Sequence, residues 1–419
     1  MTTILLSSYA CLPNHGSEEG NGWMYATLLS ERGLRVHCIT RADFRSRIEP
    51  ALAGGKYPNL TMHYVAVPDW LQRAYGTLMG MYGHYLWWQW QAATLARELD
   101  RTEHFDLVHH VTYSSLQLGS FMYRLGKPFI FGPVGGGQRV PKAFKQYVGG
   151  YYSREVFRDA VSWVLQRLNP GFYKTLRQAD RVLISNADTY KLAKRYRGDR
   201  PLDRRLDSGI VANFMPPTCT ERPKQPDVLN LLWVGRLLPR KAIELTIAAF
   251  SRVDPKLPIR LTIVGGQGQI AAQVPSLLER YGVVDRVDWV GHVPYDTVQQ
   301  YYRQSDVFFF TSLRDSCPMQ LMEAMAYCLP IVTLDLHGQA ELVDGSNGIK
   351  VPVRDPEQTI TDLAKAIERL YHQPEYRLKL GQQAYDWAKT QLWSHRIDFY
   401  ADHYYPVLLN QSVEVATNS

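Results

Sequence analysis

The sequence is poor in cysteine and has no long apolar run. Its 419 residues include five cysteines, an odd number with no C-x-x-C spacing among them. This usage predicts neither a zinc site nor a disulfide framework and favours a reducing cytosol. No run of roughly 18 apolar residues occurs, so no membrane-spanning helix is expected. The apolar start is short and lacks the charged residues of a signal peptide. The cysteines are Cys11, Cys38, Cys219, Cys317 and Cys328.

Further chemical signatures are missing as well. No cluster of His, Cys, Asp or Glu has the spacing of metal ligands, so the sequence predicts no bound metal and no cofactor. The first glycine-containing loop lacks the G-x-G-x-x-G pattern of dinucleotide-binding proteins. No nucleic-acid-binding module is recognisable, and a net charge of +7 alone is a weak reason to expect nucleic acid as a partner.

The sequence does contain enough residues for two domains, with an uneven charge. Its length exceeds one ordinary core, and 45% hydrophobic and 21% charged residues are globular values. Residues 1–215 carry 27 Lys and Arg against 17 Asp and Glu, whereas the remainder carries 20 against 23. A basic first half indicates an anionic partner, such as a membrane surface or an acidic substrate. An ordinary solvated basic face is the alternative.

The order of apolar runs predicts an α/β protein with two parallel sheets. A strand over residues 3–9, a loop containing Gly16, a helix over 23–32 and a strand over 35–40 form the start of a doubly wound sheet. Gly16 allows the backbone to approach a ligand, with a simple turn as the alternative. Residues 198–208 are polar and are expected to form a surface loop.

A linker is expected near the middle of the chain. Two prolines and a change in charge balance mark residues 210–217. From Leu229 onward, short strands that end in glycine alternate with helices, which predicts the second sheet. We therefore expect domains over residues 1–213 and 214–390, followed by a helical segment over 391–419.

Two segments of the first half have the chemistry of a site. FDLVHHVT predicts a strand that ends in His109, His110 and Thr112, and ligands of open α/β sheets bind at the carboxyl ends of strands. A structural role for one of the two histidines is the alternative. After the next strand, PVGGGQRVP contains Gly135 and Gly136 and predicts a loop that lines a ligand.

The second half contains a stronger pattern, SLRDSCPMQLMEAMAYCLPIVTLDLHGQAELV, over residues 312–343. It predicts a loop with Asp315, a helix over 319–327 that contains Glu323, and a buried strand. A helix N-terminus favours a bound phosphate, and a carboxylate on either side of it is suited to hydroxyl groups. The alternative is an amphipathic helix with two solvated acids.

Two cations precede this pattern. Arg236 and Lys241 follow a predicted strand and Gly235, five residues apart. Fixed cations of this kind stabilise the charge that develops on a departing diphosphate, and an arginine suits bidentate phosphate contacts. Taken alone, either residue is equally well interpreted as an ordinary surface cation.

VGRLLPRK, LTIVGGQG and the acid–x7–acid stretch together resemble the retaining family 4 glycosyltransferases of the GT-B fold, also described as glycosyl transferases group 1. The resemblance covers essentially the whole chain. SYACLPNHGSEEGNGW and FGPVGGG resemble a subgroup that acts in bacterial exopolysaccharide and other surface-glycan assembly. The family pattern has glutamate at the position of Asp315 and glycine at that of Ala242, and a glycine-rich turn at 316–318.

The resemblance implies two Rossmann-like parallel-sheet domains facing each other across a cleft, with the C-terminal helix crossing back onto the first domain. It also implies residue roles. The expected catalytic residues are His110, Arg236, Lys241 and Asp315. Those expected to bind the donor, besides the last three, are Gly16, Ser17, Gly235, Gly265, Gly291, His292, Cys317, Pro318, Met319, Gln320 and Glu323. Those expected on the acceptor or sugar side are His109, Thr112, Gly135 and Gly136.

The implied function is transfer of a sugar from a nucleotide-diphosphate sugar, with UDP favoured, to a glycan or lipid-linked acceptor. The family reaction retains the anomeric configuration by front-face attack, with a covalent intermediate on Asp315 as the lesser option. The expected location is cytoplasmic, with peripheral contact at the inner face of the cell membrane through the basic first domain. The alternatives are a non-catalytic glycan- or nucleotide-sugar-binding protein, and a nucleotide-sugar epimerase or hydrolase on the same fold.

Overall fold

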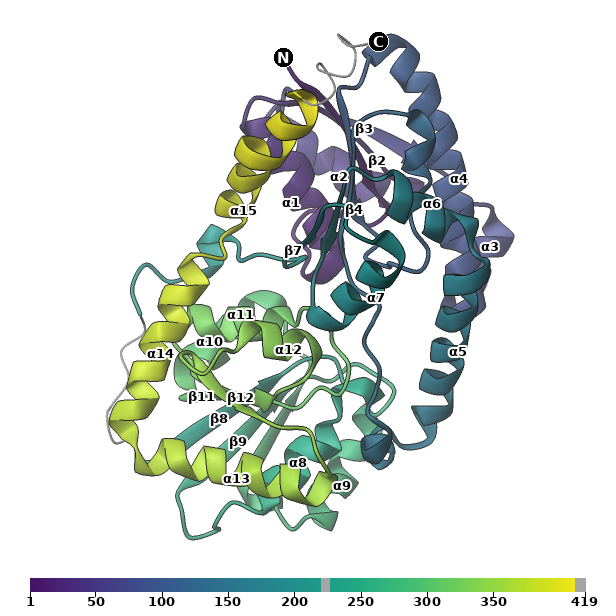
Figure 1. Cartoon of the computed structure of the whole chain (residues 1–419). Helices are drawn as coiled ribbons and strands as arrows, with labels where there is room; N and C mark the ends of the chain where they lie inside the picture. Colours follow the sequence, from purple (N-terminus) through teal and green to yellow (C-terminus); the bar gives the residue numbers. More distant parts are fainter. Residues whose placement is uncertain (220–226, 411–419) are drawn as a thin grey trace. The chain divides into compact units, whose positions relative to one another are not determined.

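Figure 1 shows the computed structural model of the chain, which describes residues 1–219 and 227–410. By their internal contacts the residues form two compact units. Unit 1 comprises residues 1–137, 158–209 and the C-terminal segment from Trp393, and unit 2 comprises 138–157 and 210–392. The sequence-based boundaries put 138–157 in the first domain, whereas the contacts group this segment with unit 2.

Unit 1 is built on a seven-stranded parallel sheet with strand order β3-β2-β1-β4-β5-β6-β7. The central strands β1, β4 and β5 are buried along their whole length, as expected for a parallel sheet that helices cover on both faces. The strands are β1 Thr3–Ser8, β2 Arg35–Arg41, β3 Leu60–Val65, β4 Leu107–Thr112, β5 Phe129–Val134, β6 Arg181–Ile184 and β7 Leu202–Arg204.

The helices of unit 1 lie between these strands in sequence and after the last of them. They are α1 Ser17–Glu31, α2 Arg45–Leu52, α3 Asp69–Arg73, α4 Leu78–Glu103, α6 Pro170–Gln178, α7 Ala187–Arg197 and α15 Trp393–Phe399. The division at 157/158 falls within α5, Tyr152–Leu168. Among the described residues, no helix combines the length and apolarity needed to cross a bilayer.

One predicted loop of unit 1 is partly a strand. Residues 198–208 contain β7, in which Leu202 pairs with Val182 of β6. The expectation of a surface loop is wrong here because β7 is a three-residue edge strand, LDR, whose residues are at most half-buried. A strand that packs little against its neighbours does not need the apolar alternation by which strands are recognised.

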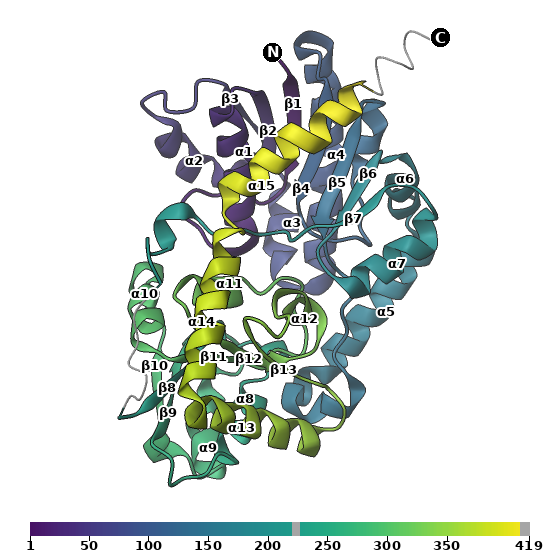
Figure 2. The same ribbon diagram turned by 60° about the vertical axis from the view of Figure 1, so that its left-hand side comes forward.

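The C-terminal segment completes the core of unit 1. Trp393, Tyr400 and Tyr405 are buried in one cluster with residues of β1, α1 and β2. The Tyr25 ring of α1 meets the Trp393 ring at 5.4 Å between centroids. Figure 2 shows α15 running along the face of the sheet that carries α1. The part of the predicted segment from residue 411 onward lies outside the described residues.

Unit 2 is built on a six-stranded parallel sheet with strand order β10-β9-β8-β11-β12-β13. Its strands are β8 Leu229–Val234, β9 Ile259–Val264, β10 Val287–Gly291, β11 Val307–Phe310, β12 Ile331–Leu334 and β13 Gly348–Val351. Its helices are α8 Ile243–Ser251, α9 Val274–Arg280, α10 Tyr295–Gln304, α11 Met319–Ala326, α12 His337–Leu342, α13 Pro356–His372 and α14 Pro374–Lys389.

Each sheet has one topological switch point, where connections leave in opposite directions. In unit 1 it lies between β1 and β4, and in unit 2 between β8 and β11. Doubly wound proteins bind ligands beyond the carboxyl ends of the strands at such a point. Gly16, the residues from His109 to Thr112, Arg236 and Lys241, and Asp315 lie in or after these four strands, whereas Gly135, Gly265 and Gly291 lie at the ends of β5, β9 and β10.

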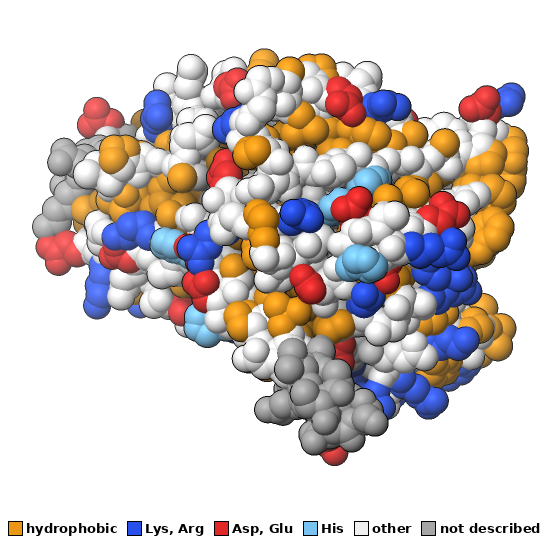
Figure 3. All heavy atoms as spheres, turned by 90° about the horizontal axis from the view of Figure 1, so that it is seen from above, with side chains coloured by type: hydrophobic (Ala, Val, Ile, Leu, Met, Phe, Trp, Pro, Cys, Tyr) orange, Lys and Arg blue, Asp and Glu red, His pale blue; other side chains and the backbone are white. Residues whose placement is uncertain are grey.

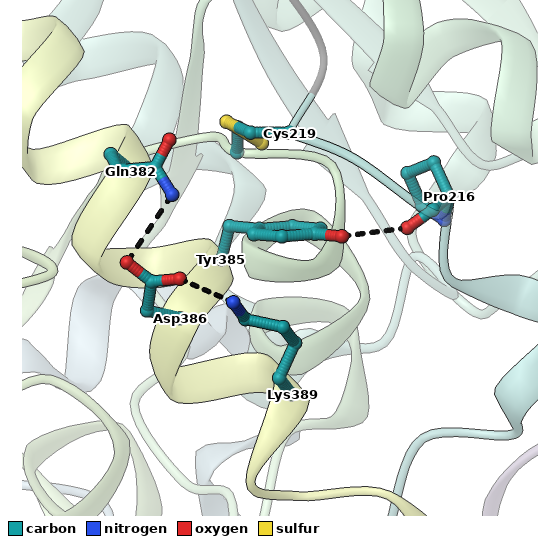
Figure 4. Close-up of a disulfide and its surroundings, with 7 residues drawn as sticks. Pro216, Cys219, Gln382, Tyr385, Asp386 and Lys389 are labelled. Carbon is teal, nitrogen blue, oxygen red and sulfur yellow. Dashed lines mark hydrogen bonds and ion pairs between the residues drawn. A yellow bond between two sulfur atoms is a disulfide. The ribbon is translucent and has the colours of Figure 1, made fainter.

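A disulfide joins two distant parts of unit 2. Cys219 and Cys328 are bonded, with their Cα atoms 5.6 Å apart and 109 residues between them in sequence. Tyr385 of α14 donates a hydrogen bond to the Pro216 carbonyl beside this bridge (Figure 4). The sequence predicted no disulfide framework and gave no sign of this single bridge, because spacing rules detect neighbouring cysteines and not segments that the fold brings together.

Candidate functional site

An ion cluster occupies the switch point of unit 2. The ammonium of Lys241 contacts the Asp315 carboxylate, and Nη1 of Arg240 lies 3.3 Å from Oδ2 of the same carboxylate. The two cations stand on a 3₁₀ turn, η6 (Pro239–Lys241), after β8, and Asp315 stands in the loop after β11. The Lys241 and Asp315 side chains are only 5% and 13% exposed, so the charges interact with little screening by water.

Backbone hydrogen bonds hold the two loops in register. The Arg240 carbonyl accepts from the Leu313 N–H at 2.9 Å and from the Ser312 hydroxyl at 3.2 Å. Nη1 of Arg240 donates to the Arg314 carbonyl at 2.8 Å. Ala242 then turns the chain into α8 with a left-handed backbone, φ 50°. Glycine adopts this conformation more easily, which gives the glycine of the family pattern a physical reason.

Burial and the ion pair shift the pKa values of this cluster. Burial lowers the pKa of the Lys241 ammonium to about 8, although the opposite charge of Asp315 partly offsets the effect. Burial also raises the pKa of the Asp315 carboxyl, but the charges of Lys241 and Arg240 outweigh it and hold that pKa at about 2. Asp315 is therefore ionised at any physiological pH.

The two predicted phosphate cations lie in different environments. Lys241 is buried in the ion pair, whereas Arg236 is exposed and its side chain has no hydrogen bond or ion pair to the described residues. Sequence reasoning missed Arg240, the second cation on Asp315. The sequence Pro239–Lys241 does not predict which side chains the 3₁₀ turn directs at the neighbouring loop. The two adjacent cations in it were the signal that could have indicated Arg240.

The segment from Cys317 to Gln320 leads into α11. No side chain caps the first turn of this helix, and Pro318 stands at its N-cap. The first N–H groups of a helix have no intrahelical acceptor, so this turn offers donors one turn before Glu323. The helix therefore begins directly after the loop that carries Asp315, as predicted from the sequence.

Two tyrosines of α10 hold the Glu323 carboxylate. Tyr295 donates to Oε1 at 3.0 Å and Tyr302 donates to Oε2 at 2.9 Å. Glu323 is 8% exposed, and burial raises its pKa. A carboxylate accepts about four hydrogen bonds, so acceptor capacity remains for a ligand hydroxyl. Sequence reasoning missed both tyrosines, which stand 28 and 21 residues before Glu323.

The glycines after β8, β9 and β10 let three loops pack backbone against backbone. A Cβ on Gly265 would lie 2.1 Å from the Gly235 carbonyl oxygen. The Gly265 N–H donates to the Gly291 carbonyl at 2.8 Å. His292 follows directly and is exposed. Close loop packing thus explains Gly265 and Gly235, and their contact with a donor stays a prediction.

The segment 138–157 is anchored beside Asp315. Arg314 forms a two-pronged ion pair with Glu155, with Nε 2.7 Å from Oε2 and Nη2 3.0 Å from Oε1. His337, at the start of α12, contacts the Arg139 carbonyl at 2.8 Å. These contacts give the physical reason why the segment belongs with unit 2.

At the switch point of unit 1, His110 lies in a network of uncharged groups. Its Nδ1 lies 2.9 Å from the Ser7 hydroxyl and 3.1 Å from that of Ser120, and its Nε2 lies 3.2 Å from the Tyr85 hydroxyl. The ring is fully buried, and burial lowers its pKa to about 3. His110 is therefore neutral, and its expected place beside the transferred sugar stays a prediction.

His109 and Thr112 join elements of unit 1. Nδ1 of His109 lies 3.0 Å from the Tyr405 hydroxyl and Nε2 lies 2.7 Å from the Gly132 carbonyl, and burial lowers the His109 pKa to about 4. Thr112 donates to the Ala10 carbonyl at 2.9 Å. Both side chains are fully buried, which supports a structural role for these two residues.

The two glycine-containing loops of unit 1 differ in how closely other atoms approach their glycines. Space around Gly16 is open, whereas a Cβ on Gly136 would lie 2.3 Å from the Gln117 side chain. The Gly135 N–H donates to the Ser114 carbonyl at 3.2 Å. Glu18, which sequence reasoning missed, accepts a hydrogen bond from the Ser114 N–H. The side chain of Ser17 lies outside the described part of the chain.

Comparison with known proteins agrees with this architecture. The chain is 25% identical over 391 residues, 89% of its length and 83% of the relative, to the D-inositol 3-phosphate glycosyltransferase of Stackebrandtia nassauensis. The enzyme of that name from Streptosporangium roseum is 30% identical over 204 residues, 46% of either chain. The chain thus spans about half the length of some curated relatives that it matches.

A solved structure extends the likeness to the whole fold. Anabaena Alr3699/HepE in complex with UDP-glucose matches with a TM-score of 0.59 and 15% identity over 99% of this chain and 100% of that chain. The two parallel-sheet units therefore define a protein of the GT-B fold. Residues 221–387 match the family model described as Glycosyl transferases group 1. The likeness to this family model therefore extends over the larger part of unit 2.

Proposed function

We propose that this protein is a retaining glycosyltransferase that moves a sugar from a nucleotide-diphosphate sugar to a glycan or lipid-linked acceptor. The ion cluster of Arg240, Lys241 and Asp315 at the switch point of unit 2 is the observation that carries the proposal. The Anabaena protein was solved with UDP-glucose, which supports a UDP-sugar as donor. The proposed setting is bacterial surface or exopolysaccharide synthesis, with peripheral contact at the inner membrane face.

The donor diphosphate would be held by three kinds of group. Lys241 offers an ammonium that Asp315 fixes in place. Arg236 is exposed without an ion pair among the described residues and suits bidentate contact with a phosphate. The first N–H groups of α11 point along the helix axis, where its dipole favours negative charge. Glu323 would accept hydrogen bonds from hydroxyls of the donor ribose.

The reaction exchanges one C–O bond for another. The bond between the anomeric carbon and the diphosphate oxygen breaks, and the bond from that carbon to the acceptor oxygen forms on the same face. The acceptor proton passes to the leaving phosphate oxygen. Charge grows on the diphosphate as it leaves, and cations already fixed in place stabilise that charge without further reorganisation.

Asp315 is better suited to positioning than to nucleophilic attack. Its carboxylate is held by two cations, and a carboxylate with a pKa of about 2 is a weak nucleophile. This favours front-face attack over a covalent intermediate on Asp315. The carboxylate fixes Lys241 and Arg240 beside the diphosphate and leaves its remaining lone pairs for sugar hydroxyls.

The test is release of nucleoside diphosphate from UDP-, GDP- and TDP-sugars, with membrane extract supplying acceptors. We expect turnover of one donor and a loss of about 100-fold or more in Arg236→Ala, since a cation that contacts the diphosphate is removed. Arg252→Ala is the matched control, because Arg252 is an exposed arginine at the end of α8 that pairs with Glu357 at 2.8 Å.

Two results would overturn the proposal. Absence of turnover with every donor, while equilibrium binding of a nucleotide sugar persists, would favour the binding-protein alternative. Consumption of the donor at an equal rate without any acceptor, or interconversion of its sugar, would favour the hydrolase or epimerase alternative.

A further inference from the structure

Helix α5 exposes most of its apolar side chains, whereas Leu165 packs partly buried against the core of unit 1. Val156, Phe157, Trp163, Val164 and Leu168 are between 41% and 74% exposed. These residues are spaced by one, six, one and four positions, which places them on one side of the helix. The exposed Ala160 lies on the same side between Phe157 and Trp163. One side of a 17-residue helix is thus an apolar surface open to its surroundings.

The opposite side of α5 is polar and faces the protein. Ser162 and Gln166 are buried, and Glu155 is engaged by Arg314. Helix α13 shows the ordinary arrangement, with Ile360, Leu363, Ile367 and Leu370 buried. Unlike α13, α5 therefore turns its polar side toward the protein. The chain does not gain the stabilisation that burial of the exposed apolar side would give.

The exposed charges on α5 and on the segments next to it in sequence have one sign. Between residues 139 and 178 the two acids, Glu155 and Asp159, are partly buried and paired with Arg314 and Arg158. Every exposed charged residue in that range is a lysine or arginine. They are Arg139, Lys142, Lys145, Arg154, Arg167, Lys174 and Arg177. Figure 3 shows hydrophobic patches with Lys and Arg beside them along its right-hand edge.

The combination fits a lipid surface better than a second copy of the chain. An aromatic and aliphatic stripe with cations at its rim is the composition of helices that lie in the plane of an anionic bilayer. The Arg167 guanidinium stacks on the Trp163 ring at 3.8 Å, which holds a cation and an amphipathic ring side by side. Two copies meeting through this face would bring their cations together.

We propose that α5 docks flat on an anionic lipid surface, with its apolar side among the acyl chains and its cations on the headgroups. The inference deepens the proposed function, since a lipid-linked acceptor would be met at that surface. It assigns the contact to the exposed side of α5, and not to basic charge spread over the first half of the chain.

The test is co-sedimentation of the full chain with vesicles of phosphatidylglycerol and phosphatidylcholine, and with phosphatidylcholine vesicles alone. We expect binding to the anionic vesicles only. Trp163→Ser/Leu168→Ser and, separately, Arg154→Glu/Arg167→Glu should each lower the partition constant by about tenfold or more. Trp70→Ser, which removes an exposed tryptophan on α3, is the matched control and should bind like wild type.

The readouts separate this inference from the proposed function. Equilibrium binding of the nucleotide sugar should be unchanged in both α5 variants, whose circular dichroism should match wild type. Wild-type-like vesicle binding of both variants, or no binding by the wild type, would overturn the docking proposal whatever the enzymatic result. Concentration-dependent dimerisation that Trp163→Ser/Leu168→Ser abolishes would instead assign the face to protein contacts.

Discussion

At the switch point of unit 2, the loops after β8 and β11 bring together one carboxylate and two cations. At that of unit 1, the ends of β1 and β4 and the segment with Ser120 bring together an imidazole and hydroxyls without net charge. Both sheets have the same kind of topology, so the difference arises from the side chains that stand at the two switch points. It teaches that the fold supplies the place for a ligand, whereas the buried charges decide which unit is suited to a diphosphate.

The strongest test of this contrast removes the ammonium of the charged site. Lys241→Ala should lower the rate of nucleoside diphosphate release by about 100- to 1,000-fold, because a buried cation beside the developing charge is lost. It should also destabilise unit 2 by about 3–5 kcal/mol, since Asp315 keeps a buried charge with one partner fewer. Rates and urea unfolding give the two numbers.

The control for Lys241→Ala is Lys389→Ala on α14. Lys389 pairs with Asp386 at 2.6 Å in an exposed position (Figure 4). Exposed ion pairs add little to stability, so neither the rate nor the melting temperature should change. Equal effects of the two substitutions would contradict the idea that burial makes the Lys241–Asp315 pair special.

The next prediction concerns how the activity depends on pH, through the buried ammonium of Lys241 in unit 2. Burial sets the pKa of Lys241 at about 8, so the ammonium loses its proton above that pH. The kcat/KM for the donor should therefore fall about tenfold per pH unit on the alkaline side. Lys241→Arg keeps the charge and should remove this fall. An alkaline limb that is identical in the variant would show that another group titrates.

A smaller effect is expected at the Glu323 carboxylate. Glu323→Gln keeps the shape but removes the charge that accepts from donor hydroxyls, and it should raise the donor KM about tenfold. Glu357→Gln, an exposed member of an ion pair on α13, is the control. A change in kcat with an unaltered KM would place Glu323 in the chemical step and not in donor binding.

The uncharged His110 of unit 1 should affect the free energy of unfolding at acid pH and not the rate of nucleoside diphosphate release. Burial lowers the pKa of His110 to about 3, whereas an unfolded imidazole titrates near its usual value of about 6.5. The unfolded state then binds more protons, so stability falls as pH drops from about 6.5 to 4. His110→Gln should reduce that slope by about 1.4 kcal/mol per pH unit. Denaturant unfolding at several pH values measures it, and an unchanged slope would contradict the assignment.

Much of the architecture follows from the sequence because each buried strand is a continuous apolar run that ends in glycine or a polar loop. The acid–x7–acid spacing likewise fixes Asp315 before α11 and Glu323 inside it. Local signals of this kind need no knowledge of the tertiary fold. They predicted where the candidate residues stand along the chain.

What the sequence could not predict depends on residues far apart. Tyr302 meets Glu323 across 21 positions, and Cys219 meets Cys328 across 109. Arg240 was missed because a single 3₁₀ turn decides which of three neighbouring cations meets Asp315. Such pairings depend on helix packing and loop direction, and no spacing rule contains that information.

The composition of unit 1 has a consequence for synthesis in the cell. Its buried cluster includes Trp393, Tyr400 and Tyr405, which are synthesised after the whole of unit 2. Unit 2 ends at residue 392, so its residues are all synthesised before those of unit 1 are complete. At roughly 5–20 residues per second, the first 209 residues wait about ten to forty seconds for their final helix. During that interval the apolar surface around Tyr25 is uncovered, which makes the nascent first half a natural client of chaperones.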